Sequence, residues 1–211
     1  MTTSSLAIFI VSSLVLLLTP GPAVLYIIAR SINQGRQAGV VSAVGLSLGT
    51  MVHVLAAAFG LSALLATSAL AFNAVKLLGA AYLIYLGIKT LRTPLPEDTQ
   101  VEAPPRKLKQ IFVQGFIVNV LNPKLALFFF AYLPQFVDMS AGSVATQIIF
   151  LGLIFTGLGV VSDSLYAIVA GTLGGWLKNN PTFVKLQRTV SGFVYIFLGV
   201  TTAFAGADSK S

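Results

Sequence analysis

The sequence predicts an all-α membrane protein in which six transmembrane helices form two inverted three-helix repeats. Three observations predict this fold class: the composition, six long apolar segments, and the similarity of the two halves of the chain. Of the 211 residues, 56% are hydrophobic and 9% are charged, whereas a soluble domain carries about 25% charged residues. The mean hydropathy of +0.89 also indicates an integral membrane protein.

The composition excludes several classes of function. The chain has no cysteine and one histidine, which excludes disulfides, thiol nucleophiles and a histidine-rich metal site. No phosphate-binding loop is present, so we expect no nucleotide cofactor and no ATP-driven pump. The net charge of +7 is better explained as loop charge that sets membrane topology than as a nucleic-acid site.

Six apolar segments are each long enough to cross a bilayer, which takes about 20 helical residues. They cover residues 6–28, 38–62, 67–88, 111–135, 144–171 and 189–206. The first and fourth segments contain helix-breaking proline motifs, Thr19-Pro20-Gly21-Pro22 and Asn122-Pro123-Lys124. A break at membrane depth is tolerated only where protein or a water-filled cavity satisfies the freed backbone groups. We therefore expect two broken helices around an internal cavity.

Basic residues predict the topology. Ten of the thirteen lysines and arginines fall in odd-numbered loops, and positive loops remain in the cytoplasm. Both termini are thus expected on the outer side of a bacterial inner membrane. The chain divides into a first repeat (residues 1–90), a cytoplasmic linker (91–110) and a second repeat (111–211).

Three features recur in the same order in both halves. Leu86-Gly87 matches Leu198-Gly199 at an offset of 112 residues, His53 matches Asp163 at 110, and Pro22 matches Pro123 at 101. Because each half has three spans, the second half must enter the membrane in the opposite direction, as in secondary transporters. Chance similarity between apolar segments is the alternative explanation.

Polar residues inside the spans are the candidate site. An intramembrane charge costs about 2.5–3.5 kcal/mol and usually marks function. Lys124 is such a cation, unless it extends to the interface. We predict a substrate-binding set from the two breaks and the adjacent amides: Pro20, Gly21, Pro22, Asn119, Asn122, Pro123 and Lys124.

Asp163 and His53 are the candidates for proton coupling. Asp163 is an acid within an apolar segment, so it should face the interior and find a partner. It could pair with Lys124 or relay protons. His53 follows Gly45 and Gly49 at helical spacing, a small-residue packing pattern, so it could equally be a hydrogen-bonded packing residue.

Several of these motifs resemble the LysE/RhtB family of amino-acid efflux proteins. The resemblance rests on Thr19-Pro20-Gly21-Pro22, Gly35-Arg36-Gln37-Ala38-Gly39, the Gly45 and Gly49 pair, the run from Leu78 to Gly87, and Asn119 with Asn122-Pro123-Lys124. It covers essentially the whole chain. It implies export of an amino acid or close derivative from the cytoplasm, driven by the proton gradient.

From these residues we hypothesise a site for a zwitterion. Backbone N–H groups at a half-helix start, with Lys124, would hold the substrate carboxylate. Freed carbonyls, Asn119, Asn122 and Asp163 would receive the ammonium. The expected partners are the lipid bilayer and this small molecule, and glycine-rich faces permit a homodimer. The rival hypotheses are a passive channel, a metal-cation exporter and a membrane-embedded enzyme.

Overall fold

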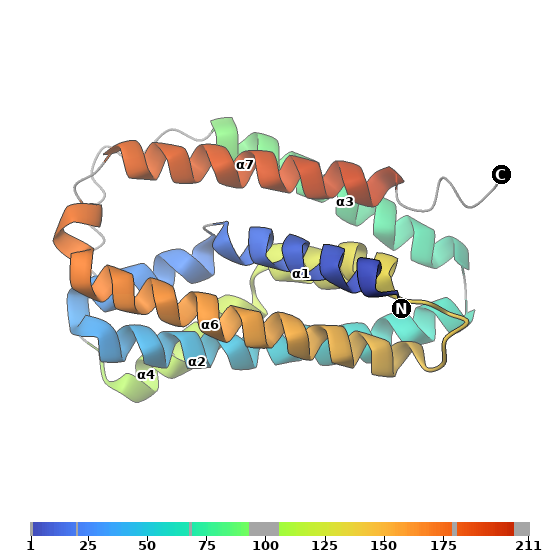
Figure 1. Cartoon of the computed structure of the whole chain (residues 1–211), viewed down its shortest axis with the longest axis horizontal. Coiled ribbons are helices and arrows are strands. Elements are labelled where there is room, and N and C mark those ends of the chain that lie inside the picture. The colour runs from blue at the N-terminus through green and yellow to red at the C-terminus, as the bar shows by residue number, and fades with distance from the viewer. Residues whose placement is uncertain (1, 20, 68, 93–105, 179–180, 205–211) are drawn as a thin grey trace.

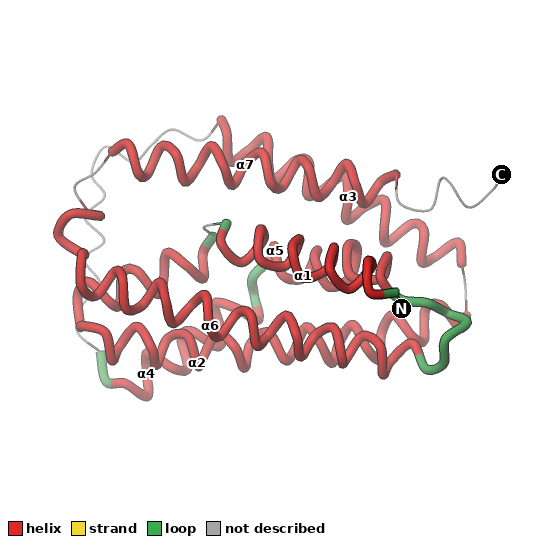
Figure 2. The backbone as a smooth tube through the Cα atoms, in the orientation of Figure 1, coloured by secondary structure: helices red, strands yellow, loops and turns green. Residues whose placement is uncertain are grey.

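The computed structural model describes residues 2–19, 21–67, 69–92, 106–178 and 181–204. Its regular elements in these ranges are all helical (Figures 1 and 2). In chain order they are α1 (Thr3–Leu18), α2 (Pro22–Thr67), α3 (Ala69–Arg92), α4 (Leu108–Val120), α5 (Pro123–Leu127), the π-helical turn η1 (Phe128–Tyr132), the 3-10 turn η2 (Leu133–Phe136), α6 (Val144–Lys178) and α7 (Pro181–Phe204).

Helices end and restart at both proline motifs. α1 ends at Leu18 and α2 begins at Pro22, while α4 ends at Val120 and α5 begins at Pro123. Proline suits the first helical position, because its missing N–H would have no intrahelical partner there. The segment from Pro123 to Phe136 is bent by 44° from α4. Both breaks lie where the sequence predicts them.

The stretch between the first two predicted spans, residues 29–37, is expected to be a loop but is a kink within α2. The residues on both sides of Gly35 are helical, and Gly35 itself has a φ of 81°. Glycine adopts this left-handed conformation without steric cost, so a single residue turns the chain. α2 therefore consists of two helices that meet at Gly35.

Apolar length identifies the chain as a membrane protein. Among the described residues, three helical stretches are long and apolar enough to span a bilayer, namely Pro22–Leu61, Asn73–Arg92 and Val144–Leu173. The bent pair formed by α4 and Pro123–Phe136 is a fourth candidate. Two shorter apolar helices, Thr3–Leu18 and Gly192–Phe204, complete the set.

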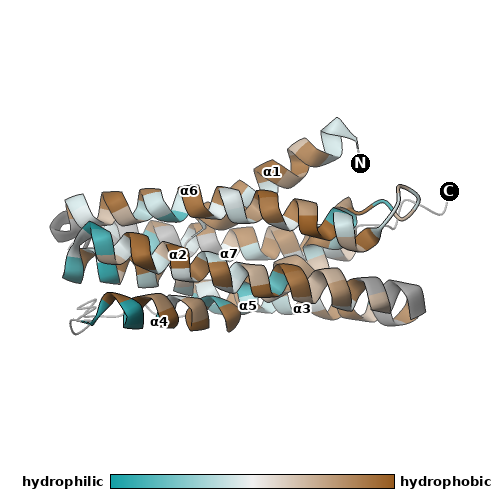
Figure 3. Cartoon of the chain, turned by 90° about the horizontal axis from the view of Figure 1, so that it is seen from below, coloured by the Kyte–Doolittle hydropathy of each residue, from teal (hydrophilic) through white to brown (hydrophobic). Residues whose placement is uncertain are grey.

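The helices form two packed groups. α2 packs against α6 and α4, and α3 packs against α7. The start of α1 and the end of α7 lie at the same end of the bundle, and α2 bends at the opposite end (Figure 1). Hydrophilic residues gather near the start of α4 and the bend of α2 (Figure 3).

A polar network at this hydrophilic end ties α2 to α4. The Gln114 side-chain oxygen accepts hydrogen bonds from Arg30 (3.1 Å) and from Arg106 (2.8 Å). Gln34 donates to the Arg106 carbonyl oxygen at 2.8 Å. Arg30, predicted to lie in a loop, is instead buried, because its guanidinium group is held between the two helices.

Glycines allow close approach in both packed groups. A Cβ atom on Gly49 of α2 would lie 2.7 Å from the Asn119 Cβ of α4. A Cβ on Gly87 of α3 would lie 2.6 Å from Ile196 Cγ1 of α7, and one on Gly199 would lie 2.7 Å from Ile84 Cγ1. These distances are far below ordinary contact, so the small-residue packing predicted for Gly49 is confirmed. Gly87 and Gly199 allow the same close approach between α3 and α7.

An aromatic core supports the break between α4 and α5. Phe128 and Phe129 are buried, and the ring centroids of Phe128 and Phe155 are 4.7 Å apart. Phe9 of α1 packs on Phe128 at 6.1 Å. The phenylalanine run after Lys124 therefore packs inward, and it fixes α5 against α1 and α6.

Candidate functional site

The two helix breaks meet at Lys124. Its ammonium group donates a hydrogen bond of 2.6 Å to the carbonyl oxygen of Thr19, just beyond the end of α1. The last carbonyls of a helix have no intrahelical partner. The neighbouring Leu18 carbonyl accepts from the Tyr166 hydroxyl of α6 at 2.8 Å. Side chains from α5 and α6 thus satisfy the backbone that the first break frees.

Asn122 caps α5. Its side-chain oxygen accepts from the Lys124 N–H at 3.1 Å, and its carbonyl oxygen accepts from the N–H groups of Leu125 and Ala126. The expectation that these N–H groups are free for a substrate is therefore wrong for α5, because Asn122 uses them. The first turn of α2 differs from that of α5 in its surroundings, because its residues Ala23 and Val24 line a cavity.

Asn119 joins the second break to α2. Its amide nitrogen donates to the Leu46 carbonyl oxygen at 2.6 Å and to the Thr50 hydroxyl at 2.8 Å. The backbone carbonyl oxygen of Asn119 lies 2.9 Å from His53 Nε2. Because a carbonyl can only accept, His53 carries a proton on Nε2. The end of α4 is therefore satisfied by α2.

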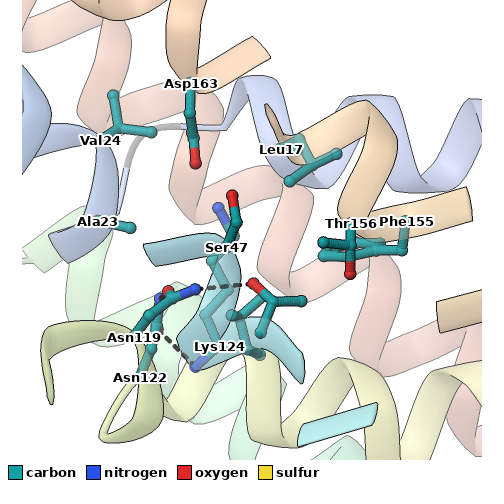
Figure 4. Close-up of a pocket in the computed structure, with 13 residues that line it drawn as sticks. Leu17, Ala23, Val24, Ser47, Asn119, Asn122, Lys124, Phe155, Thr156 and Asp163 are labelled. Carbon is teal, nitrogen blue, oxygen red and sulfur yellow. Dashed lines mark hydrogen bonds between the residues drawn. The ribbon is translucent and has the colours of Figure 1, made fainter. Parts of the chain in front are cut away.

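A small polar cavity lies between these elements (Figure 4). Its volume is about 30 Å³, enough for a water molecule, which needs about 10–15 Å³, but far below the roughly 300 Å³ of a small ligand site. In this structure the cavity is therefore closed to a substrate-sized molecule. The lining residues are Leu17, Ala23, Val24, Ser47, Thr50, Asn119, Asn122, Lys124, Leu125, Phe155, Thr156, Gly159 and Asp163.

Lys124 and Asp163 line this cavity without pairing. Both are buried, at 6% and 9% exposed, yet in the described part of the chain no hydrogen bond or ion pair within 4.0 Å joins them. Asp163 extends into the cavity from α6, toward the side where Asn119 and Lys124 lie (Figure 4). A direct pair, one of the two predicted roles of Asp163, is not formed in this state.

The other predicted residues lie in different places. Gly21 is buried beside Lys124, with a Cβ position 3.5 Å from Lys124 Cδ. Pro22 and Pro123 are exposed and are absent from the cavity lining, so they start helices rather than face the cavity. His53 stacks on Phe129 with ring centroids 6.2 Å apart, also outside the lining. Pro20 is outside the described residues.

Sequence reasoning missed the hydroxyl groups at the cavity. Ser47 and Thr50 of α2 and Thr156 of α6 all line it. A signal was present, because Thr156 precedes Asp163 by seven residues and so shares its helix face. Ser47 and Thr50 are three residues apart and also share a face.

These features define a membrane protein whose apolar helices are broken around an internal polar site, an organisation found in secondary transporters. The chain belongs to the LysE type translocator family, whose model matches residues 14–206. It is therefore a membrane transport protein.

Curated relatives cover nearly the whole chain. A homoserine/homoserine lactone efflux protein of Salmonella typhimurium (strain LT2) is 32% identical over 197 residues, 93% of this chain and 95% of that protein. Its counterpart in Salmonella typhi is 30% identical over the same length. An uncharacterized membrane protein of Bacillus subtilis (strain 168), YrhP, is 30% identical over 210 residues, 95% of this chain and 99% of that protein. No solved structure matches the chain significantly.

Proposed function

We propose that this protein exports an amino acid or a close derivative across the bacterial inner membrane, and that Lys124 and Asp163 hold the two charged ends of the substrate. One observation carries the proposal: a buried cation and a buried acid line one closed cavity without pairing with each other. Two buried charged groups that form no direct ion pair are expensive in a membrane. A zwitterion placed between them would neutralise both, and the relatives named for homoserine and homoserine lactone efflux agree with this substrate class.

The carboxylate end would be held by Lys124 and α2. An ammonium group has three N–H donors, and the bond to Thr19 accounts for one of them. Ala23 and Val24 belong to the first turn of α2 and line the cavity, and the positive end of a helix dipole favours an anion there.

The ammonium end would be held by Asp163. A carboxylate accepts several hydrogen bonds, and the hydroxyls of Ser47, Thr50 and Thr156 line the same cavity. These groups supply additional oxygens for the substrate. A homoserine side chain carries a hydroxyl of its own, which these residues can also bind.

The proposed topology is six spans in two inverted repeats. The spans are α1 with the first part of α2, the rest of α2, α3, α4 with the segment from α5 to η2, α6, and α7. Two contacts between α3 and α7 support the repeat, because Gly87 packs on Ile196 and Gly199 packs on Ile84. Adding the offset of 112 residues to Gly87 and Ile84 gives Gly199 and Ile196, so the two contacts are equivalent under the repeat. The start of α1 and the end of α7 share one end of the bundle (Figure 1), which supports termini on the same side of the membrane. We propose the outer side for them, because most basic residues fall in the opposite loops.

Export then requires the closed cavity to open alternately to each side. The Lys124–Thr19 bond joins the two broken spans, so it must loosen for these spans to move apart. Asp163 is the group we propose for proton coupling, since it faces the cavity. His53 is bonded to the Asn119 carbonyl away from the cavity, and we propose a structural role for it.

Counterflow in proteoliposomes tests this function. Vesicles loaded with unlabelled homoserine should accumulate labelled homoserine transiently and saturably, whereas a passive channel gives neither saturation nor trans-stimulation. Lys124→Gln and Asp163→Asn should each reduce the exchange rate at least tenfold. The matched controls are Lys109→Gln and Asp138→Asn, which change the same residue types at exposed positions and should exchange normally. Normal exchange by both site variants would refute the assignment.

The metal-exporter alternative gains no support from the structure. In the described ranges, no group of three histidine, cysteine, aspartate or glutamate side chains is close enough to hold a metal ion. Divalent cations need several such ligands. Vesicles that exchange homoserine but not divalent cations are the expected result.

A further inference from the structure

Tyr195 of α7 is buried next to the site although its helix belongs to the other packed group. α7 packs mainly on α3, and the cavity is lined by residues of other helices. Tyr195 is nevertheless 4% exposed and belongs to the central core cluster. It therefore brings a phenol group from α7 to the region where the broken spans meet.

The Tyr195 hydroxyl and the Lys124 ammonium group both lie close to Gly21, at the first break. A Cβ atom placed on Gly21 would be 3.3 Å from the Tyr195 hydroxyl oxygen and 3.7 Å from the Lys124 ammonium nitrogen. The hydroxyl and the ammonium group therefore approach the same point on the backbone. Glycine at position 21 leaves that point open, and any side chain there would enter the space between them.

This hydroxyl differs from those of the other enclosed tyrosines. Tyr26 donates to the Ile111 carbonyl, Tyr132 to the Ser12 hydroxyl and Tyr166 to the Leu18 carbonyl. Tyr195 makes no hydrogen bond in the described part of the chain, and its hydroxyl is not among the fully buried side-chain atoms that lack a partner there, so the oxygen retains some accessible surface. An accessible phenol oxygen without a hydrogen bond, close to the same Gly21 position as the Lys124 ammonium, is available to accept a hydrogen bond from it.

We propose that Tyr195 is a positioning residue of the transport site, whose hydroxyl takes over the Lys124 ammonium when the Lys124–Thr19 bond opens to admit a substrate carboxylate. The bond to Thr19 holds Lys124 in the closed state. A carboxylate in the cavity attracts the ammonium away from Thr19, and the Tyr195 oxygen then accepts one of its remaining N–H groups. The Lys124 side chain thereby stays ordered while it holds the substrate carboxylate. This inference rests on the proposed export function.

Tyr195→Phe tests the inference, because it removes the hydroxyl and keeps the ring. In homoserine exchange we expect KM to rise about ten- to a hundredfold, the value of one hydrogen bond to a charged group, with the maximal rate little changed. Exchange of homoserine lactone, which has no carboxylate to displace Lys124, should keep its KM. Gly21→Ala, which fills the space beside the hydroxyl, should show the same selectivity for homoserine.

Tyr82→Phe is the matched control, since Tyr82 is an exposed tyrosine on α3, and it should leave both KM values unchanged. The melting temperature in detergent separates a packing defect from the proposed role, and Tyr195→Phe should not lower it. An unchanged homoserine KM in Tyr195→Phe, or an equal rise for homoserine and its lactone, would overturn the inference. A wild-type protein without counterflow would instead refute the export function itself.

Discussion

The Lys124 ammonium donates a 2.6 Å hydrogen bond to the Thr19 carbonyl oxygen, across 105 residues of sequence. This bond joins the break between α1 and α2 to the break between α4 and α5. It forms because the end of α1 frees carbonyl groups while the start of α5 places a buried cation beside them. The two broken spans are thus held together at one point next to the cavity.

The cap at the second break should have a measurable effect on stability. Asn122→Ala removes the side-chain oxygen that accepts from the Lys124 N–H, and loss of such a cap costs about 1 kcal/mol. Asn122→Ser keeps an acceptor at the capping position and should retain most of the stability. Denaturant unfolding in detergent micelles measures both variants. Equal stability of the alanine and serine variants would show that the cap contributes nothing.

Close packing between α2 and α4 should not tolerate a methyl group. Gly49→Ala places a Cβ 2.8 Å from the Phe116 carbonyl oxygen, as well as against Asn119, and overpacking of this kind costs about 1–3 kcal/mol. Gly157→Ala is the control, because a Cβ there meets nothing within 4 Å. We expect a lower melting temperature and slower exchange for the first variant alone. Similar behaviour of the two variants would contradict the packing.

The loop between η2 and α6 should show a depressed carboxyl pKa. The side chain of Asp138 accepts hydrogen bonds from the Ser140 hydroxyl (2.6 Å) and the Ser140 N–H (2.9 Å), and these bonds lower the pKa of Asp138. A depressed pKa means that the ionised form stabilises the fold. This contribution is present above the unfolded-state pKa and is lost as the pH falls through the folded-state pKa.

Ser140→Ala should therefore raise the pKa of Asp138 toward its ordinary value. A carbon-13 NMR titration of labelled aspartate in detergent measures the change. Ser143→Ala alters another exposed serine in the same loop and should leave the pKa where it is. If Asp138 titrates identically in the wild type and in Ser140→Ala, the hydrogen bonds to Ser140 do not form in solution.

The sequence was sufficient to predict features set by single residue types. Prolines within apolar runs predict helix breaks, and the structure has breaks at both motifs. Gly49 sits where two backbones approach closely, as its spacing from Gly45 predicts. Lys124 and Asp163 are buried at one cavity, because charges within apolar segments must face the interior.

Other features depend on contacts between distant helices. Local sequence does not reveal that the partner of Lys124 is the Thr19 carbonyl rather than Asp163, because the outcome depends on how α1 and α5 meet. It likewise does not reveal that Asn122 uses the N–H groups of α5. Tyr195 resembles any interfacial tyrosine in the sequence, and its position beside Gly21 follows only from the docking of α7.

The central claim is that Lys124 and Asp163 hold opposite ends of one substrate, and a charge-specific comparison tests it most directly. Homoserine has a carboxylate and an ammonium group, whereas homoserine lactone has the amine alone. Counterflow measurements give the KM of the wild type and of each variant for homoserine and for homoserine lactone. Lys124→Gln should raise the KM for homoserine at least tenfold and spare the lactone, while Asp163→Asn should impair both. Equal losses for both substrates in Lys124→Gln, or normal lactone exchange in Asp163→Asn, would contradict the account.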